Sequence, residues 1–394
     1  MRVLMIAQQM QVRNEGQPKA GALSTFPDID LKVLVPDRYY VEGKKLRRPD
    51  PPERPGYSYH VEKVRWPWTG PGQWYLHWYP RLAGILRSFR PDVIDLWEEP
   101  WGLVSAHTCM LRNQLLPGTR IVSETEQNID KALPFPFEQF RRFTLRNADF
   151  VIGRNAEAVE ITRRKGYRGP AAVVPNGVDT DLFKPSEREA ARTALGLSGF
   201  VCGYAGRLVE QKGLAEIVHA LKECPPDVNV LFVGSGPYQE ELEKLIAGLN
   251  LGNRVRFLAD RGREELPQIM TALDVLLLPS RTTPRWKEQF GRVIIEAHAC
   301  RTPVIGSDSG AIPGVVGDGG LIVPEQNIAA LAEAIRSLRA DPALRERMSA
   351  AGRVQVERHY SWERVAAFMR GIYFGIPPRG DATYEPAGIS EAMR

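Results

Sequence analysis

No run in this sequence reaches the roughly 18 consecutive apolar residues that a membrane-spanning helix needs. The apolar run at the start, RVLMIA at 2–7, gives way at once to Gln8 and Gln9 and is also too short for the core of a signal peptide. That run therefore predicts a first buried strand. We expect a cytoplasmic protein and leave open a peripheral contact with the inner face of a membrane.

Cysteine is scarce, and neither sign of charge dominates. The four cysteines have no paired spacing, which is typical of structural thiols in a reducing cytoplasm. The 52 Lys and Arg residues are interspersed with 47 Asp and Glu residues, so the net charge is only +5. This balance favours anionic partners such as phosphate or an anionic membrane face, and it lacks the signature of a nucleic-acid-binding protein. The cysteines are Cys109, Cys202, Cys224 and Cys300.

A chain of 394 residues is long for one hydrophobic core and fits two domains. In the first half, short apolar runs alternate with amphipathic segments, which predicts a parallel sheet covered by helices on both faces. Candidate strands lie at 2–7, 31–36, 92–97, 120–125, 149–153 and 171–175, and candidate helices at 74–89, 102–114, 137–147 and 156–165.

A stretch rich in Pro, Asn and Gly follows, and then the alternating pattern begins again. We therefore predict an α/β protein with two tandem Rossmann-like, doubly wound domains that face a cleft at the carboxyl ends of both sheets. The second set of strands lies at 200–206, 228–234, 254–260, 274–280, 302–308 and 320–323, with helices at 327–339, 343–358 and 362–374. The predicted parts are a first domain at 1–178, a linker at 179–198 with a short helix at 187–195, a second domain at 199–358, a helix at 359–376 that crosses back to the first domain, and a disordered tail at 377–394.

The most informative stretch is EQFGRVIIE, which runs from Glu288 to Glu296. On one continuous helix these carboxylates would lie about 80° out of phase and roughly 12 Å apart, too far to share a small ligand. If Phe290 and Gly291 form a turn and the helix begins after it, both carboxylates face one site. The helix start would then present free backbone amides to a phosphate. A diphosphate beside two carboxylates that bind sugar hydroxyls is the hypothesis.

Two cations precede this stretch. Arg207 directly follows the predicted strand GYAG, and Lys212 opens the next predicted helix in GRLVEQKGLAEIV. Each alone reads as a solvated surface charge, whereas together at one sheet edge they can neutralise a diphosphate leaving group.

The segment VGSGPYQEELEKL satisfies only part of the dinucleotide fingerprint. Gly234 and Gly236 match its first two glycines, but Gln239 stands where the third belongs, which disfavours a dehydrogenase. A turn beside a nucleotide base and a plain strand-to-helix turn both remain open. The loop at 310–312 in SDSGAIPGVV has the same two interpretations.

In this order, these motifs resemble the retaining glycosyltransferases of family 4, which have the GT-B fold. The resemblance runs from PNGVDTDLFKP at Pro175 through GRL, EQKG, GSGP and EQFGRVIIE to TPVIGSDSGAIP. It implies that Arg207 and Lys212 hold the donor diphosphate, that Glu288 contacts the donor sugar, and that Glu296 contacts the ribose. The expected catalytic residues are Arg207, Lys212 and Glu288, and the expected donor-binding residues are Gly206, Gly234, Gly236, Gln289, Phe290, Gly291, Arg292 and Glu296.

The sequence departs from the family pattern in its first half. The loop after the first strand has only scattered glycines, and the strand ends that often carry a sugar-binding histidine read WEEP and SETEQN. His107 lies in a helical segment and is expected to be a packed histidine. Pro313 and Gly314 replace the proline and glutamate of the family, so a carboxylate contact there is lost. The candidates for acceptor-side contacts are Glu98, Glu99, Glu126, Gln127 and Asn128.

The resemblance implies a metal-independent retaining enzyme that moves a hexose-type sugar from a nucleotide donor, expected to be a UDP-sugar, to a hydroxyl of a glycan, glycolipid or small metabolite. No other cofactor is expected. A GT-B epimerase or phosphorylase and an inactive nucleotide-sugar-binding protein are the alternatives. Six tryptophans fall within 66–101 and either build the core, rest on lipid or stack on a sugar. They are Trp66, Trp68, Trp74, Trp78, Trp97 and Trp101.

Overall fold

The computed structural model describes residues 1–41, 45–52, 56–65 and 76–375. Their contacts divide the chain into two compact units. Unit 1 contains Met1–Pro175 and the chain from Val365, and unit 2 contains Asn176–Arg364. The tail predicted at 377–394 and three of the tryptophans, Trp66, Trp68 and Trp74, lie outside the described residues.

Unit 1 is built on a seven-stranded sheet in which every neighbouring pair is parallel. The strand order is β5-β2-β1-β6-β7-β8-β9. All six strands predicted in the first half are present, because parallel strands covered on both faces are almost continuously apolar. The strands are β1 (Arg2–Ile6), β2 (Asp30–Pro36), β5 (Ser58–Glu62), β6 (Val93–Leu96), β7 (Arg120–Thr125), β8 (Phe150–Gly153) and β9 (Ala171–Val173).

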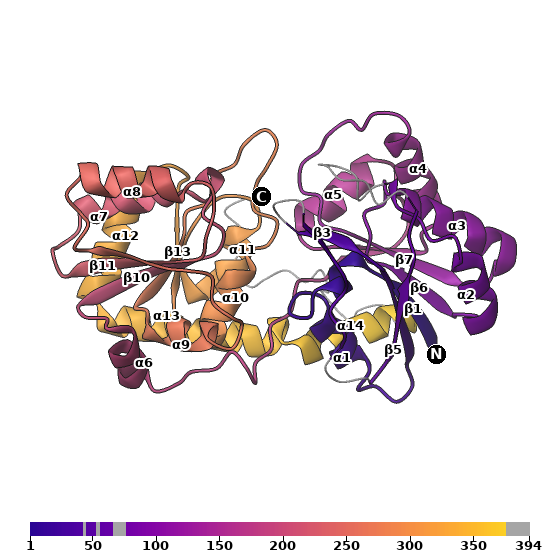
Figure 1. The fold of residues 1–394 in the computed structure, drawn as a ribbon, viewed down its shortest axis with the longest axis horizontal. Coiled ribbons are helices and arrows are strands. Elements are labelled where there is room, and N and C mark those ends of the chain that lie inside the picture. The colour runs from indigo at the N-terminus through magenta and orange to yellow at the C-terminus, as the bar shows by residue number, and fades with distance from the viewer. Residues whose placement is uncertain (42–44, 53–55, 66–75, 376–394) are drawn as a thin grey trace. The chain divides into compact units, whose positions relative to one another are not determined.

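Helices cover both faces of this sheet (Figure 1). Ile94 and Leu96 of β6 pack with residues of α2 and α3 in one hydrophobic core cluster. Asp95 points to the other face, where it meets Lys19 of α1 and Tyr373 of α14. The helices are α1 (Gln17–Leu23), α2 (Leu82–Phe89), α3 (Leu103–Leu115), α4 (Phe137–Asn147), α5 (Ala156–Arg164) and α14 (Trp362–Tyr373), of which α14 belongs to unit 1 from Val365 onward.

Unit 2 has a six-stranded parallel sheet in the order β12-β11-β10-β13-β14-β15. Helices α7, α8 and α12 lie on one face, and α9, α10 and α13 lie on the other (Figure 1). Each predicted strand is present. The strands are β10 (Phe200–Ala205), β11 (Val228–Val233), β12 (Val255–Leu258), β13 (Val275–Leu278), β14 (Val304–Ser307) and β15 (Gly320–Val323). The helices are α6 (Arg188–Leu195), α7 (Leu214–Lys222), α8 (Gln239–Gly248), α9 (Leu266–Ala272), α10 (Arg292–Ala299), α11 (Ile312–Val316), α12 (Ile328–Ala340) and α13 (Pro342–Gln355).

Some elements of unit 1 differ from the prediction. The helix predicted at 74–89 begins only at Leu82, since Pro80 lacks the amide that a helix interior needs. The described part of the tryptophan-rich segment packs into the core: Tyr79, Leu82 and Leu86 have no exposed surface. The elements that the prediction missed are α1, β5 and the antiparallel pair β3 (Tyr39–Val41) and β4 (Lys45–Arg47).

All four cysteines are free and buried, as the sequence predicted. Within the described part of the chain, no helix combines the length and the apolar composition needed to cross a membrane.

Candidate functional site

The predicted donor residues of unit 2 lie on loops at the carboxyl edge of its sheet. The strands are parallel, so the chain that follows each of them emerges at the same edge. Arg207 follows β10, the segment from Pro279 to Gly291 follows β13, and Gly310 follows β14.

Lys212 and Glu288 meet directly in this structure. The Nζ of Lys212 lies 2.5 Å from Oε2 of Glu288, which also accepts a hydrogen bond of 3.1 Å from the buried hydroxyl of Ser280. The same Nζ stands 4.9 Å from the centre of the Trp286 ring. A cation and a carboxylate that are 76 residues apart in the sequence thus form an ion pair between two loops.

Lys212 does not open the following helix as predicted, but ends a short 3-10 turn at Glu210–Lys212. Gly213 causes the break: its φ is +70°, and a Cβ atom there would lie 1.9 Å from the carbonyl oxygen of Pro279. A side chain at this position would push the loop of Lys212 away from the loop of Glu288.

The turn predicted inside the EQFGRVIIE stretch is present. Gly291 caps α10 with φ +78°, and the helix begins at Arg292. Phe290 is buried against Tyr360, with ring centroids 5.9 Å apart. Glu296 is half-buried one turn into the helix, and burial raises its pKa against the opposing charges of Arg292 and Arg263.

The loops that follow β10 and β11 are in close backbone contact at Gly206, Gly234 and Gly236. A Cβ on Gly234, whose φ is +133°, would lie 2.1 Å from the carbonyl oxygen of Gly206. A Cβ on Gly236 would lie equally close to the carbonyl oxygen of Leu208, whose amide donates to Ser235 at 2.8 Å. Close backbone packing accounts for these two glycines, as the plain-turn interpretation proposed. Whether they also contact a nucleotide stays a prediction.

The remaining donor candidates differ in exposure. The side chains of Arg207 and Arg292 are exposed, whereas Gln289 is half-buried. The carbonyl oxygen of Arg207 accepts a 2.8 Å hydrogen bond from the hydroxyl of Tyr204. The backbone of Glu288 is close to Gly310, so this loop also borders the predicted sugar site.

Sequence reasoning missed a second polar group at this edge. Glu325, just after β15, accepts hydrogen bonds from the amide and the hydroxyl of Thr282, and the same hydroxyl lies 2.9 Å from Oγ of Ser309. Its position after a predicted strand is the signal that could have found it.

In unit 1, the predicted acceptor-side carboxylates follow the carboxyl ends of β6 and β7, where Glu98 is buried and Glu99 and Glu126 are half-buried. Glu99 accepts hydrogen bonds from the Thr125 hydroxyl at 2.6 Å and from the Glu126 amide at 2.9 Å, and Glu98 accepts from the Gln8 amide at 2.7 Å. Burial raises the pKa of Glu98 to about 8 and that of Glu99 to about 7. Near neutral pH these carboxyl groups can therefore hold a proton.

Gln127 and Asn128 are less suited to an acceptor. The side-chain amide of Gln127 donates to the carbonyl of Ile129 in its own loop at 2.8 Å, and Asn128 is only 3% exposed. His107 is half-buried on α3 and packs edge-on against Trp78 at 5.2 Å, in agreement with the prediction of a packed histidine.

A buried ionic cluster next to these carboxylates was not predicted. Glu124 contacts Lys19 and Arg154, and all three side chains are at most 2% exposed. Burial alone would raise the pKa of Glu124, but the two adjacent cations lower it to about 2. Both cations also lie over Trp97, at 4.2 Å for Lys19 and 4.8 Å for Arg154. A carboxylate inside the predicted strand RIVSET was the signal for this cluster.

No group of three or more His, Cys, Asp or Glu side chains could hold a metal ion among the residues that the structure describes.

Two family models match this chain, one on each side of residue 185. Residues 44–182 match the model described as Glycosyltransferase Family 4, and residues 186–355 match Glycosyl transferases group 1. A D-inositol 3-phosphate glycosyltransferase of Corynebacterium urealyticum is 33% identical over 320 residues, which cover 75% of this chain and 71% of the relative. The chain belongs to glycosyltransferase family 4.

Another relative of this family 4 chain is the GDP-mannose-dependent monoacylated alpha-(1-6)-phosphatidylinositol monomannoside mannosyltransferase of Corynebacterium glutamicum. It is 34% identical over 215 residues, 52% of this chain and 56% of the relative. Streptomyces proteins named D-inositol 3-phosphate glycosyltransferase are matched over 52% of their length, so the chain spans about half of these relatives.

The fold of family 4 is found again in solved structures. The Anabaena protein HepE, solved in complex with UDP, superposes with a TM-score of 0.75 at 20% sequence identity, over 95% of this chain and 100% of that chain. The two parallel sheets and this likeness confirm the predicted GT-B architecture.

Proposed function

We propose that this family 4 protein is a retaining glycosyltransferase that takes a sugar from a nucleoside diphosphate donor bound by unit 2. The observation that carries the proposal is the contact of Lys212 with Glu288 in front of α10. A cation for the diphosphate, a carboxylate for the sugar and free helix amides are there gathered at one sheet edge.

Each group has a separate role in this proposal. Arg207, Lys212 and the amides at the start of α10 stabilise the charge that develops on the leaving diphosphate. Glu288 gives up part of its contact with Lys212 and binds hydroxyls of the donor sugar, while Glu296 accepts hydrogen bonds from the ribose. The leaving phosphate takes the proton of the attacking hydroxyl, so no side-chain nucleophile is needed. The proposal includes no metal ion, and a chelator should leave the rate unchanged.

Two features are inferred from the relatives: the nucleotide base of the donor and the chemical class of the acceptor. The sequence favoured a UDP-sugar, whereas a relative that covers half of this chain is named for GDP-mannose. Two relatives are named for inositol phosphate or phosphatidylinositol monomannoside acceptors. We therefore propose a phosphate-bearing polyol or glycolipid as the acceptor, with its contacts on Glu98, Glu99 and Glu126 of unit 1.

The test is a transfer assay with radiolabelled UDP-glucose and GDP-mannose, with inositol phosphate and phosphatidylinositol monomannoside as acceptors. The K212A variant should lower kcat/KM by roughly 100-fold, because a cation that stabilises the leaving group is lost. E296A should raise the KM for the donor through the loss of ribose hydrogen bonds. K244A is the matched control, since Lys244 on α8 is 70% exposed and pairs only with Glu240 among the described residues.

Three outcomes would contradict the proposal. Unchanged donor kinetics in K212A would remove the diphosphate assignment. A new sugar nucleotide formed without acceptor would indicate an epimerase. Donor binding without turnover over the whole acceptor panel would indicate an inactive binding protein. Retention is tested separately, by the anomeric configuration of the product in an NMR spectrum.

A further inference from the structure

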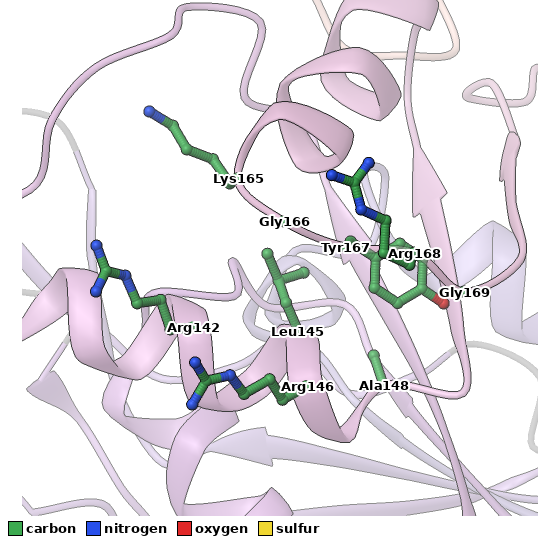
Figure 2. Close-up of a pocket in the computed structure, with 9 residues that line it drawn as sticks. All are labelled: Arg142, Leu145, Arg146, Ala148, Lys165, Gly166, Tyr167, Arg168 and Gly169. Atoms are coloured by element: carbon green, nitrogen blue, oxygen red, sulfur yellow. The ribbon is translucent and has the colours of Figure 1, made fainter.

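A basic pocket lies in unit 1, and none of the residues proposed to bind the donor or the acceptor lines it. It has a volume of about 450 Å³ and lies between the end of α4 and the turn that follows α5 (Figure 2). These segments lead into β8 and β9, so the pocket is at the amino edge of the sheet, whereas Glu98 and Glu99 follow β6 at the carboxyl edge. It is therefore distinct from the proposed acceptor site.

Four cationic side chains line the pocket. Figure 2 shows Lys165, Arg142 and Arg146 extending on one side of Leu145 and Arg168 on the other. Lys165 is paired with Asp130 at 2.5 Å, and Arg142 lies 3.2 Å from Glu138. Arg146 and Arg168 are exposed and have no carboxylate partner within the described ranges of the chain. The pocket therefore carries an excess of positive charge.

The base of the pocket is apolar and ordered. Leu145 and Tyr167 are buried together with Val151, and the hydroxyl of Tyr167 donates to the carbonyl of Pro170 at 2.9 Å. The pocket thus has a buried apolar base surrounded by cationic side chains, an arrangement that suits an anionic ligand.

The cations are not needed to satisfy the end of α5. The last carbonyl groups of that helix accept hydrogen bonds from the backbone amides of Lys165, Gly166 and Tyr167, at 2.8, 3.0 and 3.2 Å. Gly166 makes this turn with φ +97°. A structural capping role for Arg168 is therefore not required.

The solvent face of α4 adds an exposed aromatic to the positive charge. Gln139, Arg142, Phe143 and Arg146 fall within an arc of about 100° on this helix. Phe143 is 39% exposed on that face. A small dissolved anion gains nothing from an exposed phenyl ring, whereas a lipid surface accepts both the ring and the arginines.

The same sheet edge carries further cations. A second cavity, of about 410 Å³, is lined by Arg2, Arg90 and Arg120 together with Asp92. Arg2 begins β1 and Arg120 begins β7, so this cavity lies at the amino edge as well. Asp30 begins β2 and Asp149 precedes β8 at the same edge, so the charge along the edge is mixed and the excess of positive charge is at the first pocket.

We propose that the pocket formed by Arg142, Arg146, Lys165 and Arg168 binds the phosphate-bearing headgroup of an anionic phospholipid, and that Phe143 enters the lipid beside it. Unit 1 then docks peripherally on an anionic membrane. The proposal goes beyond the transferase function and does not depend on it.

Co-sedimentation of the full chain with vesicles tests this site. Vesicles of phosphatidylcholine with roughly one third phosphatidylglycerol should bind the protein, and pure phosphatidylcholine should bind it far less. R146Q/R168Q should weaken the binding by about 30-fold. Each cation near such a surface strengthens binding between roughly fivefold and sixfold, and the variant removes two of them. F143S should weaken it by about tenfold.

Matched controls lie on unit 2. R347Q/R358Q removes two exposed arginines and the same net charge, and V354S removes a side chain that is 42% exposed on α13. Both should bind vesicles like the wild type. Equal binding of R146Q/R168Q and wild type to the anionic vesicles would overturn the proposal.

A free phosphate ligand is a different source of the same chemistry. If inorganic phosphate raised the unfolding temperature of the wild type but not of R146Q/R168Q, while vesicle binding stayed equal in both, the pocket would be a site for a soluble anion. That result would refute the lipid assignment. Loss of vesicle binding in F143S, which keeps all four cations, would support it.

Discussion

The carboxyl edges of the two sheets place their charges in opposite ways. In unit 2, Arg207 is exposed and Lys212 is half-buried. In unit 1, Lys19 and Arg154 are buried and already bound to Glu124. The cations at the edge of unit 2 are thus at least partly exposed, whereas those at the edge of unit 1 are fully enclosed.

This difference has a physical reason. In the proposed function, a diphosphate brings two or more negative charges to unit 2, which suits cations that stay at least partly exposed. Unit 1 holds its own charges in balance, and because Glu98 and Glu99 can keep protons near neutral pH, they repel the proposed phosphate-bearing acceptor less than two carboxylates would. Variants that disrupt the charged or packed groups at each edge test this contrast.

The largest expected effect is in the buried cluster of unit 1. The E124A variant leaves Lys19 and Arg154 buried without their shared carboxylate, which should lower the free energy of unfolding by about 3 to 5 kcal/mol. Urea unfolding followed by circular dichroism measures it. E240A on α8 is the control, since Glu240 is 75% exposed in its pair with Lys244, and its loss should cost about 0.5 kcal/mol or less. Equal losses in the two variants would mean that the cluster is not what stabilises this edge.

The next effect is in the joined glycine loops of unit 2. G234A must fit a Cβ 2.1 Å from the carbonyl oxygen of Gly206 at φ +133°, and it should lower the free energy of unfolding by roughly 2 to 4 kcal/mol. G248A is the control, because a Cβ at the end of α8 would meet nothing within 4 Å and should change stability by about 0.5 kcal/mol at most. If G234A unfolds like the wild type, the two loops do not depend on close backbone contact.

Stability should also fall with rising pH because of Glu98. Its pKa is about 8 in the folded protein against 4.5 in the unfolded chain, so the folded state binds more protons between these values. The contribution is lost as pH rises from about 4.5 to about 8. E98Q removes it, and between about pH 5 and pH 8 the variant should lose on the order of 2 to 4 kcal/mol less than the wild type.

The measurement is the urea midpoint at both pH values, with E240Q as the exposed control. Glu99, whose pKa is about 7, leaves a smaller fall in E98Q itself. If the pH dependence of stability were identical in E98Q and wild type, Glu98 would not be the group whose protonation stabilises the folded state.

The sequence could predict the sheets and the turn before α10 because their signals are local. The parallel strands are apolar runs, and the turn at Gly291 before α10 is recognisable from the neighbouring residues alone. The cluster at Glu124 is not local: it depends on the register that sets Asp95 beside Val122 and Glu124 beside Ile152. Strand β5 was missed because an edge strand with mostly exposed residues has no apolar run to detect.

The smallest expected effect tests whether the edge of unit 2 depends on a charge cluster as the edge of unit 1 does. Ser280 is fully buried and donates a 3.1 Å hydrogen bond to Glu288, which Lys212 also contacts. S280A removes one hydrogen bond to a charged group but leaves the cation in place, so the free energy of unfolding should fall by about 1 kcal/mol. S88A on α2 is the control, because its exposed hydroxyl donates only to the carbonyl of Ile85 in the same helix. A loss in S280A as large as that in E124A would show that unit 2 also depends on a closed charge cluster, and the contrast between the two edges would then be wrong.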